Sequence, residues 1–500
     1  MTPTYLLGID SGSTVTKAAI FDMEGNTRAI GRAQVSPRHP QPHRVERDME
    51  ETWSAVAEAI RHALSNADIS NTQIAAIGIT AHGDGLYLLD TDTRPLGPAI
   101  MSLDSRARDL VATWKSQGLE QDALSLTGQF PFPYAPTALL GWIQRNQPER
   151  FSRIGSILAC KDWLRFCLTG ELAADFTESS TGFTNVSTQR YSREALRLFG
   201  LESLDHALPT MRLPTDIAGR VTRKAAAATG LKAGTPVVAG LHDVTASAVG
   251  LGHIDNGDLT ITSGTFSINE VFSDQPRPDQ RWATRNGLEP GQWLSMAISP
   301  ASSSNVDWFL QQCCTLESKT SPQILQYLES DLDAAFEDDS RIVYHPFLFG
   351  SPYEEPASAA FFGIQGWHTR AHLVRAILEG VVFNHRVHVD ALATRFAINE
   401  CRVTGGGAHT PRMAQLFADT LNRPVTITGT QEAAALGAAL CAGVGIGVYG
   451  SLQDATQSCH PVTTYRPLPT IRQTRDAAFA RYQQLVTQMA PLWDMLDTPA

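Results

Sequence analysis

Apolar runs and polar, glycine-bearing turns follow one another closely at the start of the chain. Residues Tyr5–Ile9 form an apolar run typical of a strand, and Thr16–Phe21 alternates in character as a second strand does. The stretch between them, DSGST (10–14), is polar and contains a glycine. This pattern predicts a β-hairpin with a polar, flexible tip.

A helix and a buried strand come next. Asp48 stands three residues before Glu51, which is the spacing of a capping box, and apolar residues then recur at helical intervals. The apolar run IAAIGIT (74–80) is typical of a strand that is buried on both faces. It leads into AHGDG (81–85), a polar turn at the end of a strand, where open α/β sheets bind ligands.

The middle of the chain contains a second copy of the opening pattern. Residues 236–252 (PVVAGLHDVTASAVGLG) indicate a strand, a loop at 241–243 and a helix of small residues. Residues 259–272 (LTITSGTFSINEVF) again indicate a strand, a glycine-bearing turn and a strand. We interpret the two hairpins as an internal duplication, although chance similarity of two short segments is the alternative. The duplication predicts two domains, residues 1–247 and 248–500.

The remaining pattern alternates between helices and strands, which predicts an α/β fold. Helices are expected over Thr137–Gln144, Lys161–Leu168 and Ala371–His385, and from near Glu432. Strands are expected over Arg341–Phe349, Cys401–Thr404 and Pro424–Thr428. The tail after about residue 470 reads as a helix, to which we assign no function.

The amino-acid composition indicates which class of molecule the protein binds. The 500 residues are 43% hydrophobic and 18% charged, with a net charge of −11 and no basic run, which argues against binding of nucleic acid. No apolar run reaches the length of a membrane span. Seven scattered cysteines without a CxxC pair argue against a zinc site and favour a reduced, cytoplasmic compartment. A small-molecule partner is expected.

Three glycine-bearing stretches could bind phosphate or a nucleoside. The tip around Gly12 offers backbone N–H groups and hydroxyls, and Asp10 beside it suggests Mg²⁺, because a carboxylate would otherwise repel the phosphate. Residues 263–265 (SGT) offer a second such turn. The triplet 405–407 (GGG), between a strand and a helix, offers a third backbone surface. An ordinary hairpin turn and a plain helix-entry loop are the alternatives.

Carboxylates at strand ends could bind a polyol and activate its hydroxyl. Asp243 follows a buried strand, so it could act as general base on an alcohol, or it could cap the helix that follows. His82 and Asp84 could hydrogen-bond sugar hydroxyls, unless the turn is merely solvated. Asp104 and Tyr134 are further polar candidates.

These residues resemble the FGGY family of carbohydrate kinases over nearly the whole chain. The segment GIDSGSTVTKAAIFD (8–22) resembles the first phosphate motif of the wider superfamily, and AAFFGIQGWHTRAHLVRAILE (359–379) fits the family's C-terminal pattern. The N-terminal pattern departs at Ala138 and Leu139, near which the family has a lysine, and Ser102 replaces a usual tryptophan. The resemblance implies two actin/hexokinase-like (ribonuclease H-like) domains with a cleft between them.

The resemblance also implies roles for individual residues. Asp243 corresponds to the catalytic base and also contacts the substrate, and Asp10 to the acidic residue near Mg²⁺. The implied substrate-binding residues are His82, Gly83, Asp84, Asp104 and Tyr134. The residues implied to bind ATP are Ser13, Thr14, Lys17, Gly264, Thr265, Gly405, Gly406, Gly407 and Thr410.

The resemblance therefore implies ATP-dependent phosphorylation of a terminal hydroxyl. The segments 344–351, 368–389 and 402–410 look most like the L-xylulose kinases, which favours a ketopentose. The acid at Asp84 is closer to the erythritol and glycerol kinases, so erythritol or another polyol is the first alternative. An actin-like ATPase that switches protein partners is an alternative from another class. Dimers are frequent in the family, which leaves a homodimer open.

Overall fold

The protein is described by a computed structural model over residues 4–314, 320–351, 357–405, 410–430, 432–457, 459 and 461–497. The chain forms two compact units, and neither is a continuous segment. The first comprises residues 1–256, 272–295 and 430–460, and the second comprises residues 257–271, 296–429 and 461–500. The predicted boundary between 247 and 248 stays a prediction.

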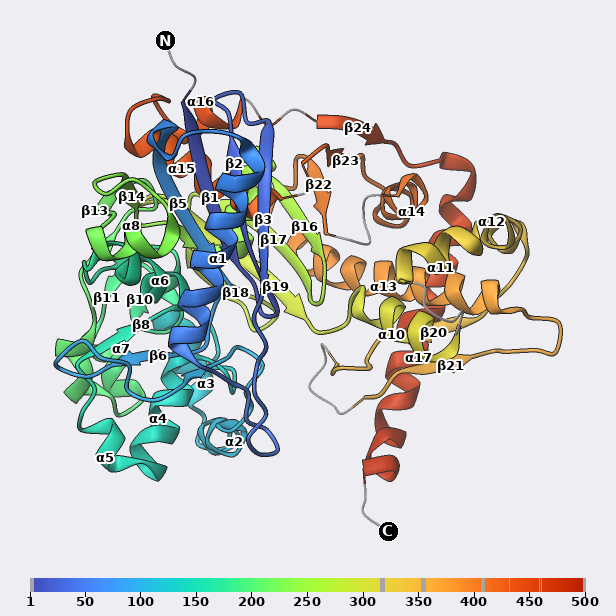
Figure 1. Cartoon of the computed structure of the whole chain (residues 1–500). Helices are drawn as coiled ribbons and strands as arrows, with labels where there is room; N and C mark the ends of the chain where they lie inside the picture. Colours follow the sequence, from blue (N-terminus) through green and yellow to red (C-terminus); the bar gives the residue numbers. More distant parts are fainter. Residues whose placement is uncertain are drawn as a thin grey trace. The chain divides into compact units, whose positions relative to one another are not determined.

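The sheet of the first unit is built around the predicted opening hairpin. β1 (Tyr5–Ser11) pairs antiparallel with β2 (Val15–Phe21), which pairs antiparallel with β3 (Thr27–Gln34). On its other side β1 pairs parallel with β5 (Ile74–Ala81). The sheet continues through β14 (Pro236–Val238) to β13 (Ile217–Arg220), and β15 (Leu241–His242) joins β5 near its carboxyl end. Figure 1 shows these strands in blue and green.

Helices cover both faces of this sheet. α1 (Met49–Ala67) begins where Asp48 accepts hydrogen bonds from the N–H groups of Glu50 and Glu51, as predicted, and it packs on β2 and β3. Leu7 and Ile9 on β1 point into the core with α1. Because side chains alternate along a strand, Gly8 points to the opposite face, where α15 (Ala433–Gly445) lies.

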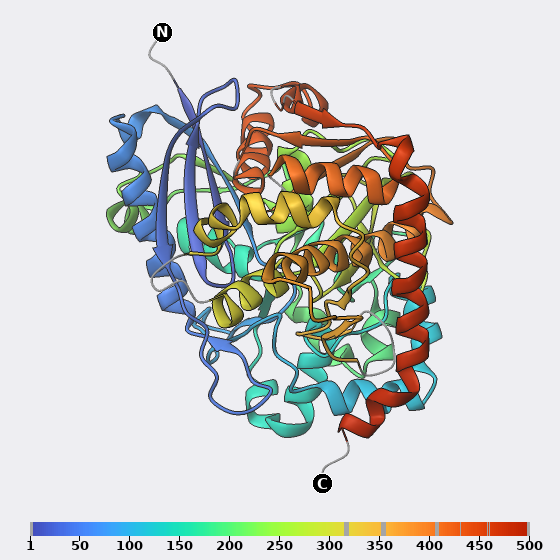
Figure 2. The same cartoon turned by 90° about the vertical axis from the view of Figure 1, so that its right-hand side faces the viewer.

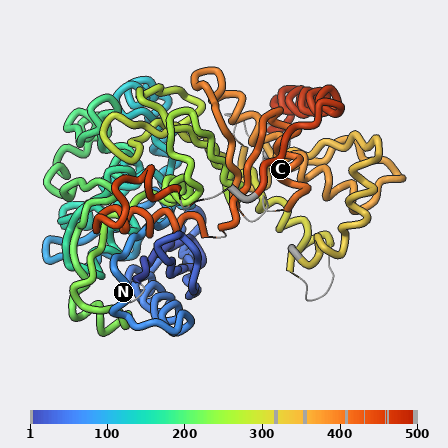
Figure 3. The backbone as a smooth tube through the Cα atoms, turned by 90° about the horizontal axis from the view of Figure 1, so that it is seen from above, coloured from blue at the N-terminus to red at the C-terminus, as the bar shows by residue number. Residues whose placement is uncertain are grey.

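Glycines let α15 approach the sheet very closely. A Cβ atom on Gly8 would lie 1.9 Å from the carbonyl oxygen of Ala435, and one on Gly78 would lie 1.8 Å from that of Ala438. The same helix packs against α9 (Asp243–Gly250). Figure 3 shows this late segment, in orange-red, among the blue and green parts of the first unit. This packing fixes the start of α9 relative to the end of β1.

The first unit also contains a smaller helical region with its own core, which includes Leu86, Trp114 and Leu139. Its helices are α2 (Arg108–Ser116), α3 (Leu119–Thr127), α4 (Pro136–Asn146), α5 (Pro148–Phe151) and α7 (Arg193–Leu198). The remaining helices of the unit are α6 (Cys160–Thr169), α8 (Arg223–Thr229), α16 (Leu452–Thr456) and the 3₁₀ turns η1 (Asn71–Gln73), η2 (Glu178–Ser180) and η3 (Glu202–Ala207). Its short strands are β4 (Glu46–Arg47), β6 (Tyr87–Leu89), β7 (Ala99–Ile100), β8 (Ser156–Leu158), β9 (Ala174–Asp175), β10 (Thr184–Asn185), β11 (Arg190–Tyr191), β12 (Met211–Arg212) and β18 (Ala283–Asn286).

The second unit contains the predicted second hairpin. β16 (Leu259–Ser263) pairs antiparallel with β17 (Ser267–Ser273) and parallel with β22 (Cys401–Thr404). β22 pairs parallel with β23 (Val425–Thr428), which pairs antiparallel with β24 (Pro461–Tyr465). β17 and β19 (Trp293–Ser299) each run from one unit into the other.

Helices of the second unit include the predicted tail. α13 (Arg370–Ala393) is longer than predicted, and α17 (Arg472–Asp497) packs beside it and beside α14 (Pro411–Leu421). Figure 2 shows α17 in red next to the orange helices. Phe383 on α13 meets Phe479 and Tyr482 on α17 in a buried aromatic cluster. The other elements are α10 (Ser304–Cys313), α11 (Ser321–Tyr327), α12 (Glu329–Glu337), β20 (Val343–His345), β21 (Ala360–Phe362) and η4 (Pro469–Ile471).

One predicted strand is shorter in the structure than the sequence suggested. The segment Arg341–Phe349 forms a strand only over Val343–His345, and Pro346 follows immediately. Proline lacks the N–H group that would continue the ladder, so the strand ends there. Within the described residues, we find no helix with the length and apolar character needed to cross a membrane.

Candidate active site

The turn that carries Asp243 is fixed by its pairing with β5. β15 aligns Leu241 with Thr80 and His242 with Ala81, and the Thr80 hydroxyl donates to the Leu241 carbonyl at 2.7 Å. His242 is the cap of α9, and Asp243 is its first helical residue, with Oδ1 accepting from the N–H of Val244 at 2.8 Å. Asp243 is therefore not the capping residue that one reading of the sequence suggested.

Asp243 is surrounded by low-dielectric protein and by other acids. Burial, together with the nearby carboxylates of Asp10 and Glu178, raises the pKa of Asp243 to about 8. A third of the side chain is nevertheless exposed, so the carboxylate is reachable. A carboxylate of raised pKa that is open to a ligand has the property that a general base for an alcohol needs.

Asp10 lies near the carboxyl end of β1, directly across the hairpin from Lys17. Burial raises the pKa of Asp10 to about 6, with Lys17 opposing this shift and Glu432 adding to it. Lys17 donates to Glu432 at 2.8 Å, and Arg32 donates to the other oxygen of Glu432 at 2.7 Å. Lys17, predicted to bind the nucleotide, thus already has a carboxylate partner, which the sequence did not reveal.

A buried arginine, Arg47, donates hydrogen bonds to carbonyl groups at the tip of the first hairpin. The Arg47 guanidinium donates to the Gly12 carbonyl at 3.1 Å and to the Ser13 carbonyl. The N–H of Gly12 donates to the Val15 carbonyl at 3.1 Å, which closes the turn. Ser13 is half-buried and Thr14 is exposed, so the hydroxyl groups predicted to meet phosphate lie at the surface of this unit.

The turn after β5 carries both His82 and Asp84, and the two side chains have different partners. Asp84 and Gly85 both adopt left-handed backbone angles, with φ of 56° and 74°. The Asp84 carboxylate accepts from Nη2 of Arg285 at 3.0 and 3.1 Å. His82 is buried next to the Tyr87 hydroxyl at 3.2 Å, and burial lowers its pKa to about 3, so the imidazole is neutral.

Tyr134 is influenced by the charge of Asp84 in this cluster, whereas Asp104 has other partners. The Tyr134 ring stacks on Phe132 at 5.4 Å, and burial together with the Asp84 charge raises the pKa of the phenol. Asp104 is fully buried, and its two oxygens accept from Arg106 and from the N–H of Val45. Its carboxylate therefore already has partners inside the protein, and a role as sugar ligand stays a prediction.

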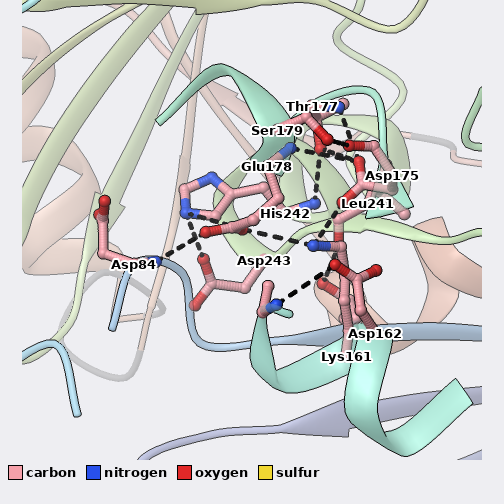
Figure 4. A network of polar contacts seen from close by, with 12 residues as sticks. Asp84, Lys161, Asp162, Asp175, Thr177, Glu178, Ser179, Leu241, His242 and Asp243 are labelled. Atoms are coloured by element: carbon pink, nitrogen blue, oxygen red, sulfur yellow. Dashed lines mark hydrogen bonds and ion pairs between the residues drawn. The ribbon is translucent and has the colours of Figure 1, made fainter. Parts of the chain in front are cut away.

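Three residues of the cluster were missed by the sequence reading: Lys161, Glu178 and Arg285. Arg285 is 4% exposed and comes from β18, about 200 residues after Asp84 in the chain. Its Nη1 atom has no hydrogen-bond partner within the described part of the chain. Glu178 and Lys161 lie in the polar network of Figure 4, together with Asp84 and Asp243. No local motif could have found them, because their partners are distant in sequence.

The second unit contains a pocket of about 970 Å³ beside the second hairpin. This size suits a nucleotide-sized ligand. Ser263, Gly264 and Thr265 line it, together with Ser303 and Ser304 at the start of α10. The Ser303 hydroxyl lies 3.0 Å from that of Ser263, and the Ser304 hydroxyl donates to the Thr265 carbonyl at 3.1 Å.

The helix that follows the third glycine stretch contributes to the same pocket. Thr410 caps α14 by accepting from the N–H of Met413, and Thr410 and Met413 line the pocket. Gly405 has φ of 103°, and a Cβ there would lie 2.3 Å from the Ser263 carbonyl oxygen. Gly406 and Gly407, also predicted to bind the nucleotide, lie outside the described residues.

Comparison with solved structures identifies the fold. The chain matches a xylulose kinase structure from Rhodospirillum rubrum with a TM-score of 0.87 and 26% identity, covering 98% of this chain and 100% of that chain. It has the two-domain, actin/hexokinase-like fold of the sugar kinases, as expected from the sequence.

Comparison of sequences identifies the family. Residues 5–250 match the N-terminal domain of the FGGY family of carbohydrate kinases, and residues 259–446 match its C-terminal domain. The chain belongs to this family and is a sugar phosphotransferase, which confirms the expected enzyme class. Kinases of this family use ATP as phosphate donor.

Curated relatives cover nearly the whole chain. It is 36% identical to an L-xylulose/3-keto-L-gulonate kinase of Escherichia coli, covering 97% of each chain. It is 37% identical to a probable L-xylulose kinase of Pasteurella multocida, covering 97% of this chain and 99% of the relative. An erythritol kinase of Brucella abortus is 29% identical, covering 98% of this chain and 97% of the relative.

Proposed function

We propose that this enzyme phosphorylates the terminal primary hydroxyl of a ketopentose, with L-xylulose as the first candidate, and that Asp243 is the general base. The observation that carries the proposal is the environment of Asp243. Its carboxylate is accessible, has a raised pKa and directly follows a strand paired with β5, whose end carries Asp84. The two relatives named L-xylulose kinases support the choice of sugar.

The sugar is held by the groups around the turn at 81–85. Asp84 accepts hydrogen bonds from hydroxyl groups while Arg285 holds its carboxylate in position. Nη1 of Arg285 is free to donate to a sugar oxygen. His82, Gly83, Asp104 and Tyr134 complete the predicted sugar-binding set, with Tyr134 remaining a neutral phenol because its pKa is raised.

Asp243 accepts the proton of the terminal hydroxyl as that oxygen attacks the γ-phosphoryl group of ATP in line. The predicted nucleotide ligands of the second unit, Gly264, Thr265 and Thr410, belong to the 970 Å³ pocket and supply backbone N–H groups and hydroxyls. Ser13 and Thr14 supply the corresponding groups on the first hairpin. Exclusion of water from the transferring phosphoryl group then prevents hydrolysis of ATP.

The residues present fit the Mg²⁺ that we expect to accompany ATP. The described residues contain no group of three or more His, Cys, Asp or Glu side chains that could hold a metal alone. This agrees with the usual behaviour of Mg²⁺, which takes one or two carboxylates and fills its shell with phosphate oxygens and water. Asp10 would be that carboxylate: burial raises its pKa to about 6 in spite of the opposing charge of Lys17, and a bound cation would favour its ionised form. Bound Mg²⁺ supplies neutralisation of the phosphate charge.

Erythritol or another polyol is the remaining alternative substrate, supported by the Brucella abortus relative and by the acid at Asp84. The alternative of a partner-switching, actin-like ATPase is set aside by the match of both FGGY domains.

ADP release at fixed Mg-ATP, measured over pentuloses, tetritols, glycerol and hexonates, tests the proposal. L-Xylulose should give the highest kcat/KM. A higher value for erythritol would replace the proposed substrate, and ATP turnover that no sugar stimulates would reject the proposal.

A further inference from the structure

Glu178 lies between the two turns on which the proposed chemistry depends. It opens η2 and is only 5% exposed, although a carboxylate would normally be solvated. One of its oxygens faces the turn that carries Asp84, and the other faces His242 and Lys161 (Figure 4). A buried carboxylate that contacts three neighbouring groups can hold those groups in a defined arrangement.

The first contact holds the turn at 81–85. Oε1 of Glu178 accepts from the N–H of Asp84 at 2.7 Å. Asp84 adopts φ of 56°, a left-handed conformation that side-chain-bearing residues rarely take, and the next residue, Gly85, is left-handed as well. Gly85 adopts this conformation without steric cost, whereas the left-handed backbone at Asp84 costs free energy, and the hydrogen bond to Glu178 helps to hold it.

The second contact reaches the turn that carries the base. Oε2 of Glu178 lies 4.0 Å from Nε2 of His242, and the same nitrogen lies 3.4 Å from Oδ1 of Asp243. Burial lowers the pKa of His242 to about 3, so these are contacts of a neutral imidazole. The two turns also touch directly, since a Cβ on Gly83 would lie 1.8 Å from Nε2 of His242.

Lys161 and Asp175 hold this part of the chain in place. Lys161 is 1% exposed and pairs with Asp175 and, at 3.4 Å, with Oε2 of Glu178. Asp175 accepts from the N–H of Thr177 at 2.7 Å and from its hydroxyl at 2.6 Å. The Thr177 hydroxyl oxygen in turn accepts from the N–H of His242 at 2.9 Å. The segment 175–178 therefore contacts both the turn at 81–85 and the turn at 241–243.

We propose that Glu178 is a positioning residue that fixes the sugar-binding turn at 81–85 and the catalytic turn at 241–243 relative to each other. It does so through the Asp84 N–H on one side and His242 on the other, with Lys161 neutralising its charge. The assignment of the two turns to sugar and base rests on the proposed function, whereas the mechanical link between them does not.

Two substitutions separate this role from a general contribution to stability. Glu178→Ala removes both contacts, whereas Glu178→Gln keeps an oxygen that can accept from the Asp84 N–H. Asp22→Asn is a matched control, because Asp22 is also a buried carboxylate that accepts backbone N–H groups of a turn, those of Glu24 and Asn26. Asp22 belongs to the β2–β3 turn, away from the residues of the cluster.

Hydrogen exchange of the full chain without ligands tests the link directly. In Glu178→Ala, exchange should rise at least tenfold in peptides covering 82–86 and also in those covering 241–245, with Asp22→Asn unchanged in both. A rise confined to 82–86, or no rise in either, would overturn the proposal. Because no substrate is used, this result is independent of whether the proposed function holds.

Kinetics then show whether the link serves the reaction. Glu178→Ala should raise the sugar KM and lower kcat, each at least tenfold, while the ATP KM stays within twofold. Glu178→Gln should recover a sugar KM within about threefold of the unaltered enzyme. Equal losses in the two variants, or a matching rise in the ATP KM, would mean that Glu178 only supports folding and would overturn the proposal.

Discussion

The hairpins β1–β2 and β16–β17 share antiparallel pairing and a glycine at the tip, but the side chains around the two tips differ. The first has Asp10 opposite Lys17, with Glu432 and Arg47 beside them. The second is surrounded by hydroxyl groups, of which the Ser263 hydroxyl lies 3.0 Å from that of Ser303. The two hairpins therefore share a backbone arrangement but differ in the chemistry of their side chains.

This difference indicates a division of labour. Charged side chains surround the tip of the first hairpin, in the unit that contains Asp243, where the proposed mechanism moves a proton and develops charge. Hydroxyl groups gather at the tip of the second hairpin, beside the 970 Å³ pocket, although the lining of the pocket farther from the tip also includes charged side chains such as Asp333 and Arg412. Substitutions of Asp243 and Asp10 should therefore affect turnover, and substitutions of the hydroxyls at the second tip should affect nucleotide affinity.

The largest effect is expected for Asp243→Asn. Loss of the base should lower kcat by about 10²–10⁴-fold, the range that general-base catalysis contributes. ATP affinity, measured by calorimetry, should stay within about threefold, since the proposed nucleotide pocket is formed by other residues. Turnover within tenfold of the unaltered enzyme would remove Asp243 from its proposed role.

A smaller effect is expected for Asp10→Asn. The amide keeps the size of the side chain but cannot neutralise a cation, so the concentration of Mg²⁺ that gives half-maximal turnover should rise about tenfold or more. Titration of activity with Mg²⁺ at saturating ATP and sugar measures this. An unchanged Mg²⁺ requirement would show that Asp10 does not serve the metal.

The pH dependence of the free energy of unfolding should reveal the raised pKa of Asp243. Asp243 has a pKa of about 8 in the folded protein, well above the value of a free aspartate, so the folded state binds its proton more tightly than the unfolded state. Stability from this group is therefore present below about pH 4 and is lost as pH rises through 8.

Asp243→Asn should remove the loss of stability that occurs as pH rises through 8. Because a third of the side chain is exposed, the gain at pH 8 is discounted to about 1 kcal/mol, or about 1 °C in Tm for a protein of this size. Thermal unfolding of both proteins without ligands at pH 5 and pH 8 measures this. A Tm difference that is equal at the two pH values would contradict the raised pKa.

Local patterns in the sequence were enough to predict much of the fold. The two hairpins, the helix capped by Asp48 and the strand before the 81–85 turn follow from the spacing of apolar residues and from turn chemistry, both of which are local. The extent of the strand at Arg341–Phe349 was wrong, because the apolar run was given more weight than Pro346, which ends the strand after His345.

The site could be predicted only where a residue follows a recognisable strand end, as Asp10, Asp84 and Asp243 do. Arg285, Glu178 and Lys161 escaped prediction because their partners lie far away in the chain. Arg285 meets Asp84 across 201 positions. Such contacts depend on tertiary packing, and a single sequence contains no sign of them.

The most direct test of the division of labour is the pair of Michaelis constants, for sugar and for ATP, in Asp84→Ala and Thr265→Val. Each change removes a proposed ligand contact worth about 1.5–3 kcal/mol, which corresponds to roughly a 10- to 100-fold rise in one constant. Asp84→Ala should raise only the sugar KM, and Thr265→Val only the ATP KM. If either variant raised both constants together, or if the pattern were reversed, the assignment of sugar to the first unit and nucleotide to the second would be contradicted.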